Sequence, residues 1–167
     1  MTRRLAYLTM ENTDGWSIDA DLAFPSMKAL GWEVDAIAWR TERPDWDHYD
    51  AVYIGVPWDY PEDPEGFLST LGRIDQSRAL LVNDLALVHW SLAKTYLRDL
   101  EQRGADIVPS LWYDEMNPRV IQDAFERHGS DRIIVKPVVS TNATDTYLLT
   151  RERARALADD LARVFLN

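Results

Sequence analysis

Residues 50–56 form a nearly continuous apolar run, Asp50-Ala51-Val52-Tyr53-Ile54-Gly55-Val56, which limits the possible folds more than any other stretch of the chain. A strand with apolar side chains on both faces must be covered on both faces, which is typical of a parallel sheet flanked by helices. Further strand patterns occupy residues 5–9, 33–39 and 79–82, and helix patterns occupy residues 22–31 and 61–76. This alternation predicts a small, doubly wound α/β layer.

The first predicted helix has recognisable ends. Asp19 or Asp21 is suited to cap its start, and Gly31 is suited to close it. Pro25 then falls in the first turn, where its missing N–H costs nothing. The apolar side chains available for the core are Leu22, Met27 and Leu30.

Two loops are predicted at the carboxyl ends of strands, where open α/β sheets bind their ligands. Residues 10–18 are polar and contain Glu11, which we take as a candidate substrate-binding residue. Residues 56–61 read Val-Pro-Trp-Asp-Tyr-Pro, and the two prolines stiffen this loop into a plausible binding wall. The alternative is a packed turn whose aromatic rings cover the edge of the sheet.

The pattern changes after Asn83. Residues 91–103 predict a helix that ends at Gly104, with an apolar stripe formed by Leu92, Tyr96, Leu97 and Leu100. A strand at residues 110–112 and a helix at residues 118–128 follow. Thr150 is suited to cap a last helix. Its apolar side chains, at helical spacing, are Ala154, Leu157, Ala158, Leu161, Val164 and Phe165.

A buried strand is predicted at residues 133–135, with a return strand from Leu148 and a polar loop between them. Lys136 lies where the first strand ends, and the following proline holds it in an extended conformation. The hydroxyl and amide groups of the loop, beginning at Ser140, Thr141 and Asn142, face this lysine. Lysine and loop together could clamp a phosphate. The alternative is an ordinary solvated lysine beside a hairpin loop.

Composition excludes several functions. The chain of 167 residues has 28 acidic and 18 basic residues and a net charge of −10, which argues against binding nucleic acid. It has no cysteine, so disulfides and thiolate sites are excluded. No apolar run approaches membrane-spanning length and no long apolar signal segment precedes the first strand, so we expect a soluble cytoplasmic protein without a membrane partner. The histidines lack metal-ligand spacing, and no P-loop or dinucleotide motif is present.

Three motifs, taken in order, resemble those of the ATP-grasp superfamily, and more closely its glutathione-synthetase-like and cycloserine-ligase-like branch. In that superfamily a strand ends in Val-Lys-Pro before a flexible loop over the ATP phosphates, as residues 135–137 do here. Trp58-Asp59-Tyr60 followed by Phe67-Leu68 is similar to the branch's sequence after the third strand of its N-terminal domain. Asn83 and Lys94 match an asparagine at a strand end and the helical lysine that leads into the ATP-grasp domain.

This resemblance implies a two-part α/β organisation. Residues 1–86 would form a Rossmann-like pre-ATP-grasp domain, and residues 87–167 the first α+β subdomain of an ATP-grasp fold, with the C-terminal half absent. It also implies ATP and Mg²⁺ as cofactors. The residues implied for the ATP phosphates are Lys94, Lys136, Ser140, Thr141 and Asn142, and those implied for the substrate are Trp58, Asp59 and Tyr60, beside Glu11.

The chain departs from the family pattern in two respects. In the family, the metal ligands and the strand at the adenine edge follow the point where this sequence ends, so no residue is assigned to Mg²⁺. The phosphate loop of the family is usually rich in glycine, whereas residues 140–146 contain none and carry Asp145. We therefore expect a fragment or a shortened relative with little or no turnover by itself.

The function implied is the N-terminal part of an ATP-dependent carboxylate–amine ligase, which uses an acyl-phosphate intermediate and a small amino-acid-like substrate. A second hypothesis is a non-catalytic α/β interaction domain that has lost ATP use. A third is a flavodoxin-like or regulator-like single domain, with one sheet continuous through residues 1–149. The apolar face of the last helix predicts a homodimer or another association through that face.

Overall fold

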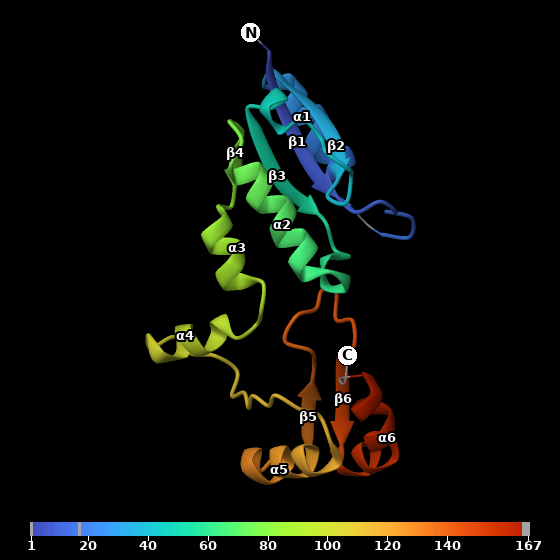
Figure 1. Ribbon diagram of the computed structural model, residues 1–167. Helices are drawn as coiled ribbons and strands as arrows, with labels where there is room; N and C mark the ends of the chain where they lie inside the picture. The colour runs from blue at the N-terminus through green and yellow to red at the C-terminus, as the bar shows by residue number, and fades with distance from the viewer. Residues whose placement is uncertain (1, 17, 165–167) are drawn as a thin grey trace. The chain divides into compact units, whose positions relative to one another are not determined.

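The computed structural model describes residues 2–16 and 18–164 (Figure 1). The chain divides into two compact units, Met1–Leu92 and Ala93–Asn167. The described strands form two separate sheets, so the single continuous sheet of the third hypothesis is wrong. The sequence-based domain boundary after residue 86 stays a prediction.

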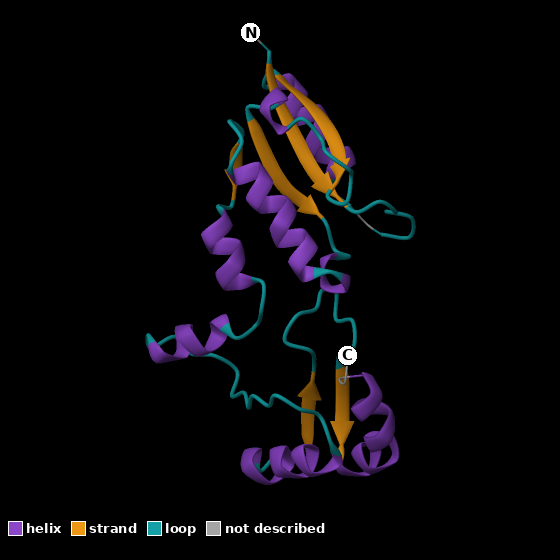
Figure 2. Ribbon diagram, viewed as in Figure 1, coloured by secondary structure: helices purple, strands orange, loops and turns teal. Residues whose placement is uncertain are grey.

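The first unit contains a parallel sheet with the strand order β2-β1-β3-β4 (Figure 2). The mixed α/β class expected from the sequence is thereby confirmed. The elements of this unit are β1 (Arg3–Thr9), α1 (Ala20–Ala29), β2 (Trp32–Ala38), η1 (Trp46–His48), β3 (Ala51–Val56), η2 (Tyr60–Glu62), α2 (Pro64–Asp75), β4 (Leu80–Val82) and α3 (Leu85–Ser91).

Alternate residues of β1 are buried on opposite faces of this sheet, as expected for a strand covered on both sides. Ala6 and Leu8 belong to a core that also contains Phe67 and Leu71 of α2. Tyr7 belongs to another cluster, with Ala20 and Phe24 of α1. Helices α1 and α2 therefore cover different faces, which makes the layer doubly wound.

The buried face of α1 differs from the one predicted. Leu22 and Leu30 are 77% and 72% exposed, so assigning them to the core was wrong. The helix begins at Ala20 rather than near Leu22, so Pro25 lies inside it. Its inward positions are Ala20 and Phe24, which are one turn apart and share a face. Gly31 closes the helix with a φ of +84°, as expected. Asp19 is the N-cap residue but makes no side-chain cap bond, and the Asp21 side chain lies outside the described part.

A polar cluster joins β1, β2 and the segment before β3. Arg4 Nη2 donates to Asp35 Oδ2 at 2.7 Å, and the Tyr49 hydroxyl donates to the same oxygen at 3.1 Å. The hydrogen bond from Arg4 is the main reason that the pKa of Asp35 is lowered, and burial acts in the opposite direction. The ionised carboxylate therefore stabilises the fold.

We expect this contribution to disappear in acid. Because the pKa of Asp35 is lower in the folded chain, its stabilising effect is complete above the ordinary pKa of 3.8 and is lost as the pH falls through the folded-state value. Asp35→Asn should lower the free energy of unfolding at neutral pH, and its difference from the parent chain should shrink below about pH 4. Urea unfolding at several pH values measures this, and a difference independent of pH would contradict it.

The second unit contains the antiparallel pair β5 and β6, in which Ile133 faces Leu149. Its core combines these two residues with Phe125 of α5 and with Ala154 and Leu161 of α6. The elements are α4 (Tyr96–Gln102), α5 (Pro118–His128), β5 (Arg132–Val135), β6 (Tyr147–Thr150) and α6 (Arg151–Val164). The predicted strand pair and the helix at 118–128 are confirmed.

The apolar face of α6 is used inside this unit. Thr150 Oγ1 accepts from the amide of Arg153 at 3.2 Å, so the predicted cap is confirmed. Ala154 and Leu161 are 5% and 1% exposed, so the expectation of an exposed apolar face is wrong for them. The side chains of Ala158 and Val164, and the whole of Phe165, lie outside the described residues.

Two other predicted elements differ in this part of the chain. The single helix expected at residues 91–103 is interrupted, because α3 ends at Ser91 and α4 begins at Tyr96. Gly104 still ends α4, with a φ of +89°. The strand expected at residues 110–112 is not formed. No helix among the described residues has the length and apolar character needed to cross a membrane.

Candidate functional site

The carboxyl ends of β1 and β3 lie side by side in the first unit, because these two strands are neighbours in the sheet. The chain leaves β1 towards β2 on one side, whereas β3 pairs with β4 on the other, so the strand order reverses between them. Such a switch point is where doubly wound sheets bind ligands. The loops identified from the sequence, residues 10–18 and 56–61, begin at the ends of these two strands.

Trp58 connects these loops. Its ring meets the ring of Trp16 edge-on, with centroids 5.4 Å apart. Trp58 is half-buried, and Trp16 is 44% exposed, so the pair forms a partly open aromatic wall. Glu11 is exposed in the same loop as Trp16. The sequence identified Trp58 and Glu11, whereas Trp16 was missed because no pattern linked it to a residue 42 positions later.

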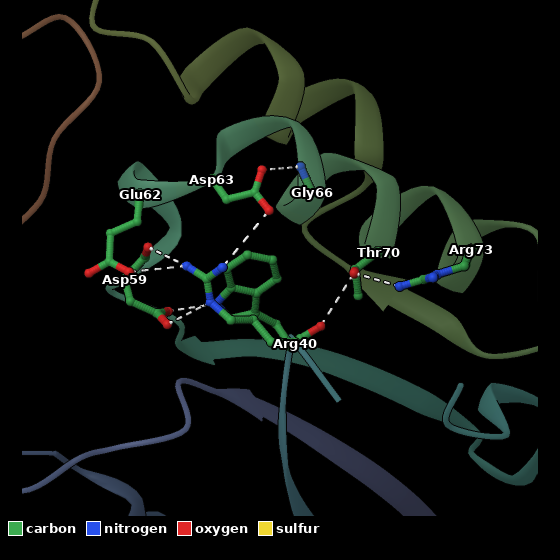
Figure 3. A network of polar contacts seen from close by, with 8 residues as sticks. Arg40, Asp59, Glu62, Asp63, Gly66, Thr70 and Arg73 are labelled. Atoms are coloured by element: carbon green, nitrogen blue, oxygen red, sulfur yellow. Dashed lines mark hydrogen bonds and ion pairs between the residues drawn. The ribbon is translucent and has the colours of Figure 1, made fainter. Parts of the chain in front are cut away.

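Asp59 points into the protein, where its carboxylate holds two side chains that follow β2 (Figure 3). Oδ1 accepts from the Trp39 indole at 2.6 Å, and Oδ2 accepts from Arg40 Nε at 3.2 Å. The guanidinium of Arg40 lies 4.1 Å from the centroid of the Trp39 ring. Trp39 is only 2% exposed. The carboxylate that was predicted to bind substrate thus fixes the shape of the loop.

Arg40 also contacts the start of α2, as Figure 3 shows. Its guanidinium lies 3.3 Å from Glu62 Oε2 and 3.9 Å from Asp63 Oδ2. The Asp63 carboxylate also accepts from the amide of Gly66 at 2.9 Å, which caps the helix. Arg40 therefore fastens the end of β2 to the loop after β3.

Tyr60 is packed rather than open. Its ring stacks on Phe67 of α2 with a centroid distance of 5.3 Å, and burial raises the pKa of its hydroxyl. The three predicted substrate residues 58–60 therefore differ in their surroundings. Only Trp58 contributes to the partly open wall, while Asp59 and Tyr60 hold the loop in place.

Lys94 lies in the turn between α3 and α4, and not on a helix as predicted. Its ammonium group donates to the Ser140 hydroxyl at 2.7 Å, to the Ser140 carbonyl at 2.9 Å and to the Val138 carbonyl at 3.4 Å. Its backbone amide donates to the same Val138 carbonyl at 2.9 Å. These bonds explain why the helix is interrupted here, since they turn the residue towards the loop that follows β5.

Lys136 follows β5 directly and is exposed. The pKa of Lys94 is lowered, first by burial and second by the positive charge of Lys136. The two predicted lysines therefore share one electrostatic environment within the second unit. A negatively charged ligand there would relieve their repulsion.

The loop after β5 has the backbone shape that glycine usually supplies, although it contains no glycine. Asn142, Ala143 and Asp145 have φ angles of 49°, 59° and 51°. A turn closes where the amide of Thr144 donates to the Thr141 carbonyl at 2.8 Å. Asparagine and aspartate tolerate this left-handed region, whereas alanine pays a steric penalty there.

Ala143→Gly should therefore stabilise the second unit by up to about 1 kcal/mol, because glycine adopts positive φ without steric cost. Thr144→Gly is the matched control, since Thr144 is not among the positive-φ residues and should only gain freedom when unfolded. Chemical denaturation of both variants measures the effect. Equal destabilisation by both would contradict the strain assigned to Ala143.

A metal site is not formed by the residues that the structure describes. They contain no group of three or more histidine, aspartate or glutamate side chains arranged to hold a metal ion.

Sequence comparison finds similarity to two descriptions of one kind of protein. The family described as D-cycloserine synthetase DcsG, N-terminal domain, matches residues 5–83. The cycloserine biosynthesis protein DcsG of Streptomyces lavendulae is 25% identical over 162 residues, covering 93% of this chain and 54% of that protein. The chain thus spans about half the length of this relative.

Solved structures share the fold over nearly the whole chain. The crystal structure of D-cycloserine synthetase DcsG has a TM-score of 0.79 at 24% identity and covers 97% of this chain and 55% of its own. A RimK domain protein of the ATP-grasp type from Sphaerobacter thermophilus has a TM-score of 0.68 at 15% identity, covering 96% of this chain and 60% of its own. The chain therefore shares its fold with part of an ATP-grasp protein.

Another structural neighbour is the macrocyclase MdnC of Microcystis aeruginosa, solved with its precursor peptide MdnA. It has a TM-score of 0.59 at 14% identity, covering 93% of this chain and 64% of its own. The ATP-grasp type of fold expected from Val135-Lys136-Pro137 and the tryptophan-containing loop is confirmed. The roles of individual site residues stay predictions.

Proposed function

We propose that this chain is the N-terminal part of an ATP-dependent ligase that joins a carboxylate to an amine. Residues 1–86 would help to bind a small, amino-acid-like substrate, and residues 87–167 would supply part of the nucleotide site. The named relative, a cycloserine biosynthesis protein, supports this substrate class. A cytoplasmic location is consistent with such a biosynthetic role.

The observation that carries this proposal is the pairing of Lys94 and Lys136. Burial and the positive charge of Lys136 lower the pKa of Lys94, which lies beside a turn of hydroxyls and amides. Such a site favours an anion. Lys94 already orders Ser140, with 2.7 Å between the ammonium and the hydroxyl, so the loop is held ready before a ligand arrives.

In the nucleotide-bound protein, Lys136 and the loop residues Ser140, Thr141 and Asn142 would hold the phosphates, with Lys94 fixing the loop from behind. When bound, ATP would supply the phosphoryl group that activates a carboxylate for attack by an amine. Mg²⁺ belongs to the same proposal through the family resemblance. The described residues offer no set of ligands that fits it, so no role in this chain is assigned to the metal.

The substrate would lie at the switch point of the first sheet. Trp58 and Trp16 provide an aromatic wall, with centroids 5.4 Å apart, and the exposed carboxylate of Glu11 is suited to an ammonium group. Asp59 and Tyr60 would act indirectly, because their side chains are committed to Trp39, Arg40 and Phe67.

Calorimetric titration of the 167-residue chain with Mg-ATP tests the proposal. We expect saturable binding, together with little or no ATP hydrolysis when amino acids are added, because metal ligands are missing from the described residues. Robust turnover by this chain alone would contradict its assignment as an incomplete ligase.

One observation favours a second function, a non-catalytic interaction domain. All three hydrogen bonds of the Lys94 ammonium group go to the protein itself, which is the number of donors that a lysine has. A lysine used in this way stabilises a loop without any ligand. The absence of saturable binding of Mg-ATP, in a chain whose folding is verified by circular dichroism, would support this function over the first.

A further inference from the structure

A second positively charged site lies in the first unit, next to Arg40, the residue that holds the loop after β3. A hollow of about 370 Å³ is lined by Arg40, Thr41, Glu42 and Arg43, which follow β2, and by Arg73 of α2. Three of its five lining residues are arginines, in a chain with a net charge of −10. Such a concentration of positive charge attracts negatively charged groups.

The charge of Arg40 is already matched. Its guanidinium has the carboxylates of Asp59, Glu62 and Asp63 at 3.2, 3.3 and 3.9 Å. Arg40 is therefore a fixed wall of the hollow rather than a group available to a ligand.

The other two arginines are different. Arg73 Nη2 donates to the neutral hydroxyl of Thr70 at 2.8 Å, and this hydroxyl donates to the Trp39 carbonyl at 3.3 Å (Figure 3). Thr70 is 3% exposed, so it ties Arg73 to the end of β2. Within the described part of the chain, no carboxylate pairs with Arg73 or with Arg43. Glu42 is the single acidic residue of the lining.

We propose that this hollow binds a small molecule carrying a carboxylate or phosphate group, with Arg43 and Arg73 as its ligands. The planar guanidinium matches either anion with two parallel hydrogen bonds. A volume of about 370 Å³ suits a small metabolite rather than a polymer. This site needs neither Lys94 nor Lys136, so it holds whether or not the chain binds ATP.

Nuclear magnetic resonance of the arginine Nε–H groups tests this inference. The 167-residue chain is titrated at low ionic strength with succinate and, separately, with inorganic phosphate, and sodium chloride of equal ionic strength serves as the reference. We expect saturable shifts of Arg43 and Arg73 with at least one of the two anions. The anion that saturates identifies the chemical class of the ligand.

Arg43→Gln and Arg73→Gln should each weaken this binding about tenfold, as expected for the loss of a charge-assisted hydrogen bond. Arg78→Gln is the matched control, because it removes one charge from the same unit. Arg78 is paired only weakly, with Asp50 at 3.5 Å, and does not line the hollow. The Arg78→Gln variant should bind the anion as tightly as the parent chain does.

Shifts that never saturate, or that sodium chloride reproduces, would overturn the proposal, as would equal weakening by all three variants. Arg73→Gln also removes the bond to Thr70, so its amide spectrum is compared with that of the parent chain. If that spectrum changes, the test rests on Arg43→Gln alone. Among the described residues, no hydrogen bond depends on the Arg43 side chain, so this variant should keep the fold.

Discussion

Lys136→Ala is expected to weaken the binding of Mg-ATP by about 10- to 100-fold. A charged hydrogen bond to phosphate contributes about 1.5–3 kcal/mol, which corresponds to this range of affinity. Lys136 is exposed and lies at the end of β5, so its removal should leave the fold intact. Calorimetric titration of the parent chain and the variant at the same salt concentration gives the ratio directly.

Lys28→Ala provides the matched control for this prediction. Lys28 is the remaining lysine of the sequence, is exposed, and lies on α1 in the other unit, so its removal changes the net charge equally. Its affinity for Mg-ATP should equal that of the parent chain. If both variants lose affinity to the same degree, the lysine at the strand end has no special role.

Asp59→Ala should lower the free energy of unfolding of the first unit by about 2–4 kcal/mol. The substitution leaves the indole N–H of Trp39, a residue that is 2% exposed, without its acceptor, and a buried unpaired donor costs about 1–3 kcal/mol. It also leaves Arg40, whose side chain is 28% exposed, with weaker counter-charges. Urea unfolding followed by tryptophan fluorescence measures the loss.

Glu62→Ala is the control for Asp59, because it removes another carboxylate from the same arginine. The Glu62 side chain is 75% exposed, so its ion pair with Arg40 at 3.3 Å should contribute less than about 1 kcal/mol. Similar losses for both variants would mean that the bond to the Trp39 indole adds little and that Asp59 is free to serve a ligand.

The sheet of the first unit was predictable because its signals are local. The apolar run at residues 51–56 requires cover on both faces, and the structure provides α1 and α2. The core face of α1 was not predictable in the same way. Leucine at positions 22 and 30 suggested burial, but Ala20 and Phe24 face inward instead. Ala20 and Leu22 are separated by about 200° around the helix, so the two side chains cannot share one face.

The interruption of the helix around Lys94 depends on a partner that is distant in sequence. Residues 91–103 have good helical periodicity, yet Lys94 bonds to Val138 and Ser140, which lie 44 and 46 positions later. The role of Asp59 also depends on distant partners, because its carboxylate binds Trp39 and Arg40, which lie 20 and 19 positions earlier. Residue type identified these groups as candidates, but only the tertiary contacts reveal which of them are already occupied.

The loop after β5 was partly predictable from local sequence and partly not. Its position after Val135-Lys136-Pro137 followed from the sequence, and its lack of glycine suggested a poor fit to the family pattern. The structure nevertheless gives Asn142, Ala143 and Asp145 the positive φ angles that glycine would adopt. The conformational preferences of the single residues do not predict these φ angles. The turn is imposed by the strands at its two ends and by Lys94.

Nitrogen-detected resonance of the lysine ammonium groups tests the central claim most directly, since the chain contains few lysines and their signals are easily separated. Addition of Mg-ATP should shift the Nζ signals of Lys94 and Lys136, raise the pKa of Lys94 towards its ordinary value, and leave Lys28 unchanged. Unchanged signals for both residues of the pair, or an equal shift for all lysines, would contradict a nucleotide site at the end of β5.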